Sequence, residues 1–292
     1  MKSLRYEFVE KPVTAWGGMR MMKKLIDRTV IKEFMEKLPL PKPGSNRGYS
    51  PIQIVESFWV SIWIGASRFA HSGWLRYDKV LKNIFGWKEA PSQSTYSRFF
   101  GKFSWKLNNE IFTALQQWFI ESIKIEAITI EKFPNATGKL LLFDESQLPP
   151  IYRYSVFVTN LDLPAEQVWN MYKDRGDSEN RIKELKYDFA IDGFCMKKFW
   201  ATEASFRMIM VAYNLMSLFR QMVLQENRQS KLNTIKFKCF ALVGTILRRS
   251  WIVKSSREKV LKISTAGRKR LWLEGLFSKV NELSPPYLFS NA

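Results

Sequence analysis

The chain has 292 residues, and its 46% hydrophobic and 15% aromatic content is too high for a disordered basic tail. Lys and Arg number 46 against 27 Asp and Glu, and the resulting formal charge of +19 favours an anionic partner such as nucleic acid. Two cysteines and one histidine are too few for a disulfide framework or a His/Cys zinc site.

Two stretches, 52–66 and 208–219, are strongly apolar and are candidates for membrane-spanning helices. The first contains Glu56, Arg207 directly precedes the second, and both are shorter than about 18 uninterrupted apolar residues. They are therefore expected to be buried helices. The first residues contain no apolar segment typical of a signal peptide, so the sequence predicts a cytoplasmic protein without membrane contact.

The first half of the chain is predicted to be helical after a mixed segment that ends in a loop near residue 48. Pro51 is suited to the first turn of a helix, and Ser92 or Ser94 is suited to capping another. Gly86 is expected to end a short helix. The predicted helices are 51–66, 78–85, one that follows residues 91–95, and 105–123.

The residue composition changes after position 123, where short runs of β-branched and aromatic side chains favour strands. Helical patterns return from Pro164, and a loop is expected near Gly193. The tail from Leu232 is basic and mixed, with helical and strand-like pieces. The predicted strands are 125–130, 140–143 and 154–159, and the predicted helices are 164–186 and 202–225.

Four polar residues share one face of the predicted helix 164–186: Tyr172, Arg175, Glu179 and Lys186. At about 100° per residue they fall within roughly a 60° arc, along about 21 Å of helix. An apolar stripe is expected beside them, made of Met171, Ile182, Leu185 and Phe189. The simplest alternative is a surface helix on which Arg175 and Glu179 form an ordinary i,i+4 pair.

The spacing of these four residues resembles the Tyr-Arg-Glu-Lys signature of the DDE insertion-sequence transposases, a bacterial cut-and-paste family with an RNase H-like core. Segments 199–207 and 213–220 resemble the helix behind that core, and 65–100 is similar to the helical leader. The resemblance implies an α+β, mostly helical fold in which a partial RNase H-like core keeps the catalytic-helix end. The implied domains are a helical N-terminal region (1–123), the truncated core (124–225) and a basic C-terminal region (226–292).

The resemblance also implies roles for the four residues and partners for the chain. Glu179 is expected to be the third catalytic carboxylate and a ligand of Mg²⁺, which prefers oxygen ligands. Tyr172, Arg175 and Lys186 are expected to contact DNA phosphates. The expected partners are the terminal repeats of a transposon, a second copy of the chain or an intact transposase, in the bacterial nucleoid.

The chain departs from the family pattern where the two catalytic aspartates should precede Glu179. The strand predicted at 125–130 is followed by residues 131–139, which resemble a segment that the family places after its second aspartate. An internal deletion explains this. Asp144, 35 positions before Glu179, is the weaker alternative as a metal ligand. We therefore expect a transposase with impaired DNA cleavage. The alternative function is a non-catalytic DNA-binding protein or a dominant-negative regulator of transposition. A third possibility is a decayed gene product that does not fold stably.

Three further features have simpler interpretations. Residues 78–100 are compatible with a helix-turn-helix or with a plain helical hairpin. His71 is expected to pack rather than to bind a ligand. Cys195 and Cys239 are both expected to be buried as small hydrophobic residues.

Overall fold

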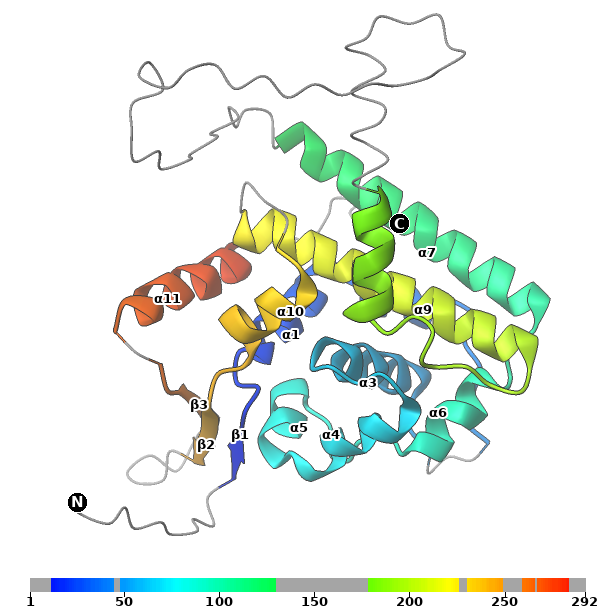
Figure 1. The fold of residues 1–292 in the computed structure, drawn as a ribbon, viewed down its shortest axis with the longest axis horizontal. Helices are drawn as coiled ribbons and strands as arrows, with labels where there is room; N and C mark the ends of the chain where they lie inside the picture. Colours follow the sequence, from blue (N-terminus) through cyan, green and yellow to red (C-terminus); the bar gives the residue numbers. More distant parts are fainter. Residues whose placement is uncertain are drawn as a thin grey trace, which may run out of the picture.

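The computed structural model describes residues 12–44, 48–129, 178–225, 230–248, 259–265 and 267–283. This part of the chain is mostly helical, 68% in all, and has a small three-stranded antiparallel sheet (Figure 1). The expectation of a mostly helical fold is therefore confirmed. The strands predicted at 140–143 and 154–159 lie outside the described residues, and the RNase H-like core stays a proposal.

The N-terminal half of the described chain supplies most of the short helices. In order, they are α1 (Met19–Thr29), α2 (Ile31–Glu36), α3 (Pro51–Trp63), the 3₁₀ helix η1 (Phe69–Gly73), α4 (Trp74–Tyr77), α5 (Lys79–Phe85), α6 (Gln93–Phe100) and the longer α7 (Trp105–Thr129). The C-terminal half contains a helix at 178–187, α9 (Phe199–Leu218), the π-helix η3 (Phe219–Leu224), α10 (Leu232–Ile235), the π-helix η4 (Lys236–Phe240) and α11 (Gly267–Glu282).

The core of the protein forms where α3 packs against α9 (Figure 1). Helix α3 begins as its sequence predicts: Ser50 Oγ accepts a hydrogen bond from Gln53 N at 3.1 Å, and Pro51 occupies the first turn. Every residue of α3 from Ile54 to Trp63 is buried. Such an apolar helix needs neighbours on all sides, and α2, α6, η1 and α9 provide them.

The one carboxylate inside α3 is compensated by two donors. Glu56 is 3% exposed, and its oxygens accept hydrogen bonds from Lys32 Nζ at 2.9 Å and from Trp87 Nε1 at 2.8 Å. This pairing lets a charged residue sit within an apolar helix. Across the described ranges, no helix is long and apolar enough to cross a membrane, in agreement with the sequence prediction for 52–66 and 208–219.

A small sheet joins the two ends of the described chain. Strand β1 (Val13–Thr14) pairs antiparallel with β2 (Gly244–Arg248), which pairs antiparallel with β3 (Lys259–Ile263). Close packing at Gly18 supports this junction: a Cβ there would lie 1.8 Å from the backbone oxygen of Cys239, so only glycine fits. Helix α11 packs on α1 and η3, so the segments from the two ends of the sequence share one body.

Several predicted elements are confirmed, but one predicted strand is wrong. Helix α5 is capped by Asp78, whose Oδ1 accepts from Leu81 N at 2.7 Å, and it ends at Gly86 in the left-handed region. The strand expected at 125–130 is instead the end of α7, which runs to Thr129 and past the predicted boundary at residue 123. The division into domains itself stays a prediction.

The helical hairpin considered for residues 78–100 is not the arrangement observed. Helix α5 packs on α1, α4 and β1, whereas α6 packs on η1, α3 and α9. The two helices thus belong to different parts of the core. As expected, His71 packs, with its ring stacked on Trp74 at 4.9 Å.

Candidate nucleic-acid interface

The helix at 178–187 carries two of the four residues predicted to share one face, and it presents both to solvent. Glu179 and Lys186 are both exposed. They lie seven residues apart, so they share one face of the helix within about 20°, separated by about 10.5 Å along its axis. Tyr172, Arg175 and Asp144 lie outside the described residues. Their placement beside Glu179 stays a prediction.

The opposite face of this helix is held in the core by a buried ion pair that the sequence pattern does not predict. Glu184 is 5% exposed and Arg220 is 6% exposed, and their side chains are directly paired. Glu184 Oε1 also accepts from Leu232 N at 2.9 Å. The guanidinium of Arg220 lies over the ring of Tyr213, with 5.7 Å from its carbon to the ring centroid. One carboxylate thus ties the helix to η3 and to the start of α10.

The prediction of an apolar stripe beside these polar residues is partly wrong. Phe189 is fully buried and Leu185 is half-buried, but Ile182 is 64% exposed. The error has a simple cause: Ile182 lies three residues after Glu179 and is carried to the same solvent side. Glu184 occupies the inward position instead, because Arg220 and Leu232 N compensate its charge.

The described residues do not complete a Mg²⁺ site. Within the described ranges, no three His, Cys, Asp or Glu side chains gather closely enough to hold a metal ion. Glu179 is an exposed carboxylate on the same helix as the cations Lys183 and Lys186. A divalent ion that needs several oxygen ligands is not held by such a set alone.

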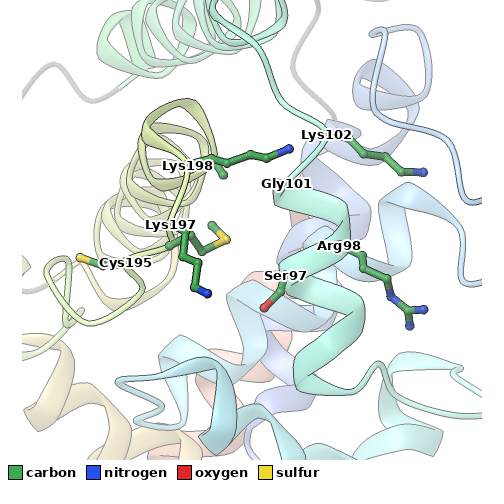
Figure 2. A pocket seen from close by; sticks show the side chains of 9 residues that line it. Ser97, Arg98, Gly101, Lys102, Cys195, Lys197 and Lys198 are labelled. Carbon is green, nitrogen blue, oxygen red and sulfur yellow. The ribbon is translucent and has the colours of Figure 1, made fainter.

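A large basic pocket lies between α6 and the segment that leads into α9. Its volume is about 800 Å³, and Figure 2 shows its residues on both walls. The side chain of Lys198 reaches toward α6 near Gly101, and Lys197 points downward from the same segment. Arg98 and Lys102 extend from the other side of α6. The lining residues are Ser97, Arg98, Gly101, Lys102, Cys195, Met196, Lys197, Lys198 and Ala201.

A second pocket of about 630 Å³ continues this depression around α6. It shares Ser97 and Arg98 with the first pocket and adds Arg76 together with the polar residues at the start of α6. The two pockets together carry five cations, which we call the α6 basic edge: Arg76, Arg98, Lys102, Lys197 and Lys198. All five are exposed.

The α6 basic edge lacks the compensation seen at Arg220. No aspartate or glutamate is among the residues that line either pocket. The hydrogen bonds of its cations go to backbone carbonyls: Lys102 Nζ donates to Lys42 O at 2.6 Å, and Arg98 Nε donates to Ser94 O at 3.2 Å. A neutral carbonyl leaves the positive charge in place, so the edge is suited to an anionic ligand.

Three hydrogen bonds hold the segment that carries Lys197 and Lys198. Thr202 Oγ1 accepts from Met196 N at 2.9 Å and donates to Met196 O at 3.0 Å, and Ser205 Oγ donates to Phe194 O at 3.0 Å. At Gly193, a Cβ would lie 2.0 Å from Ser67 O, so the loop passes close to the backbone after α3. These contacts fix the backbone from which the side chains of Lys197 and Lys198 extend.

Cys195 lies at the rim of this pocket and corrects another expectation. It is exposed, and its Sγ donates to Asp192 O at 3.3 Å, whereas Cys239 is buried as predicted. The periodicity of the sequence gave no reason to separate the two. Pairing of α6 with the 195–198 segment, almost one hundred residues later, was likewise invisible in the sequence.

Comparison with known families adds evidence about the second half of the chain. Residues 143–284, just under half of the chain, match the family model described as transposase DDE domain, group 1. This match supports a DDE transposase. No curated protein and no solved structure matches the chain. The matched range includes Glu179, Lys186, the Glu184–Arg220 pair and one wall of the basic pocket.

Proposed function

We propose that the chain is a DDE-type transposase that binds the terminal repeats of a transposon and has lost strand cleavage. The observation that carries this proposal is the DDE-domain match over 143–284, within which Glu179 and Lys186 share a solvent-exposed face. The α6 basic edge and the formal charge of +19 support a nucleic-acid partner independently. The bacterial nucleoid is the compartment that this function implies.

The proposed roles follow the chemistry of the side chains. Lys186, with Tyr172 and Arg175, contacts backbone phosphates, and Glu179 is the remaining carboxylate of the catalytic set. When bound, Mg²⁺ would activate the attacking oxygen and stabilise the leaving one. Loss of cleavage is proposed because the sequence lacks two aspartates in the family's context, and Asp144 is the weaker substitute. A chain that binds ends without cutting them acts as an inhibitor, alone or paired with an intact transposase.

A mobility-shift experiment tests end recognition. The probes are a duplex carrying the inverted repeat that flanks the gene and a shuffled duplex of equal length and composition. We expect the repeat to bind at least about tenfold more tightly, since specific protein–DNA complexes exceed non-specific ones by larger factors. Equal affinity for both probes would contradict recognition of ends.

The contribution of the helix at 178–187 is tested separately. Lys186→Ala is expected to weaken duplex binding and to lower the dependence of log K on log salt by about 0.9, the value for one phosphate contact on duplex DNA. Lys79→Ala removes the same charge from an exposed site on α5 and serves as the control. An unchanged salt slope in Lys186→Ala would remove this lysine from the interface.

A further inference from the structure

We propose that the α6 basic edge, together with the aromatic side chains at the start of α7 and α9, binds an unpaired DNA strand. This inference rests on the proposed DNA-binding function and adds a site and a form of DNA to it. In this arrangement, the phosphates of the DNA strand lie against the cations of the α6 basic edge, and its bases stack on the neighbouring aromatic rings. A paired duplex is the other possible occupant, and the experiment below separates the two.

The first observation is the arrangement of cations on both sides of α6. Lys197 and Lys198 line the pocket from the segment before α9, with Lys198 extending toward α6, and Arg98 and Lys102 project from the opposite side of α6 (Figure 2). Arg76 extends this row into the adjoining pocket. Because the described lining residues of both pockets contain no carboxylate, the charges are available to a strand that crosses the helix.

The second observation is a set of exposed aromatic rings at the same end of the molecule. Phe199 is 72% exposed and Trp200 is 38% exposed, and they directly follow the two lysines of the pocket. Their rings meet edge to face, with centroids 4.8 Å apart, so each supports the other. Trp105 is 60% exposed and lies three residues after Lys102, the last α6-side cation of the pocket.

A hydrogen bond holds the two aromatic segments beside each other. Asn108, in the first turn of α7, is fully buried, and its Nδ2 donates to Trp200 O at 3.1 Å and to Glu203 Oε2 at 2.8 Å. Helices α7 and α9 also pack along one another (Figure 1). Trp105 and the Phe199–Trp200 pair are therefore on neighbouring, fixed helix starts rather than on separate parts of the protein.

The combination of features selects an unpaired strand over a duplex. Phosphates attract cations in either form, but only unpaired bases present their flat faces for stacking on protein rings. Exposed large aromatic side chains have an unfavourable contact with water, and base stacking removes it. A duplex would use the five cations and leave the three rings exposed.

Fluorescence anisotropy with two labelled probes tests the proposal: a 16-nucleotide thymidine strand and a 16-base-pair duplex. The full chain is expected to bind the strand more tightly than the duplex at equal salt. Phe199→Ala is expected to weaken strand binding by about fivefold or more, as base–aromatic stacking requires, and to leave duplex binding unchanged. Phe237→Ala, which removes a 62% exposed ring in η4, is the matched control.

The charge contribution is read from the salt dependence of strand binding. The double variant Lys197→Ala/Lys198→Ala is expected to lower the slope of log K against log salt by about 1.4, at 0.7 per phosphate contact on a single strand. Lys79→Ala/Lys88→Ala removes two exposed lysines outside both pockets and should leave that slope unchanged. All substituted side chains are exposed, and circular dichroism checks that each variant keeps its helical content.

Two results would overturn the inference. One is a wild-type preference for the duplex; the other is strand binding that neither Phe199→Ala nor the Lys197/Lys198 double variant changes. Either result leaves the proposed recognition of terminal repeats standing, since that is measured on duplex repeats. Failure of repeat recognition with strand binding intact would instead contradict the proposed function alone.

Discussion

Positive charge is neutralised in one region of the molecule and exposed in another: the buried Glu184–Arg220 pair, which we call the anchor, and the α6 basic edge. At the anchor, a buried guanidinium has a buried carboxylate beside it, and the pair joins the helix at 178–187 to η3. At the edge, five exposed cations line two pockets that contain no carboxylate among their described residues. The charge at the anchor supports the fold, whereas the charge at the edge is left for a ligand.

The same contrast exists within one helix. Glu179 and Glu184 lie five residues apart, so they point about 140° away from each other. The inward glutamate is fixed by Arg220 and Leu232 N, and the outward glutamate is exposed. A carboxylate that holds the structure and a carboxylate proposed for the site are thereby kept on separate faces.

The largest expected effect comes from breaking the anchor. Arg220→Ala leaves Glu184 buried without its cation, and we expect a loss of about 3–5 kcal/mol in the free energy of unfolding. Arg207→Ala breaks the partly exposed pair with Glu203 and should cost less than about 1 kcal/mol. Urea denaturation followed by circular dichroism measures both. Similar losses in the two variants would show that the anchor does not support the fold more than a surface pair does.

A smaller effect is expected from glycine substitutions that distinguish a close contact from open space. Gly193→Ala places a Cβ 2.0 Å from Ser67 O and should destabilise the protein by about 1–3 kcal/mol while weakening strand binding, because this loop leads to Lys197. Gly275→Ala in α11 meets no atom within 4 Å and should stabilise by about 0.5–1 kcal/mol. Thermal unfolding compares them, and a stable Gly193→Ala variant would contradict the close approach.

The weakest effect is a loss of stability at alkaline pH, which originates in the core. Burial raises the pKa of Tyr96, whose hydroxyl donates to Ser57 Oγ at 2.9 Å. The phenol therefore ionises more easily in the unfolded chain, and stability falls as pH rises above about 10, by at most about 1.4 kcal/mol per pH unit. Tyr96→Phe removes the ionisable phenol, so the unfolding free energy of this variant should fall less steeply between pH 9 and 11 than that of the wild type.

A half-buried lysine, Lys32, adds to that alkaline loss of stability. Burial lowers the pKa of Lys32, but Glu56 and then Asp27 raise it, and the net shift is upward. Its stabilising contribution is complete below the ordinary lysine pKa of 10.5 and disappears as pH rises through the raised value. A steeper alkaline loss in Tyr96→Phe than in the wild type would contradict the assignment of the main effect to Tyr96.

Local sequence signals predicted the local elements well. Ser50 with Pro51 marks the start of α3, and Asp78 with Gly86 brackets α5, because caps and first-turn residues act over a few positions. The run 125–130 misled, since its β-branched residues suit a strand while the structure continues α7 to Thr129. Propensity is weak where the preceding helix already provides the hydrogen-bonding pattern.

The long-range features could not be read from spacing. The β1–β2 pairing joins residues more than two hundred positions apart, and the basic pocket joins α6 to the 195–198 segment. Both depend on how α3 and α9 pack, which a periodic pattern does not specify. Glu179 and Lys186 were predicted to share a face, and the described helix places both on its exposed side. Tyr172 and Arg175 stay predictions.

One experiment measures directly whether the protein binds transposon ends without cleaving them, as we propose. A terminal-repeat duplex labelled on one strand is incubated with the protein and Mg²⁺, and the same sample is run on a native and on a denaturing gel. We expect a shifted complex on the native gel and an intact labelled strand on the denaturing gel. A shifted complex with a cut strand at the repeat boundary would contradict it.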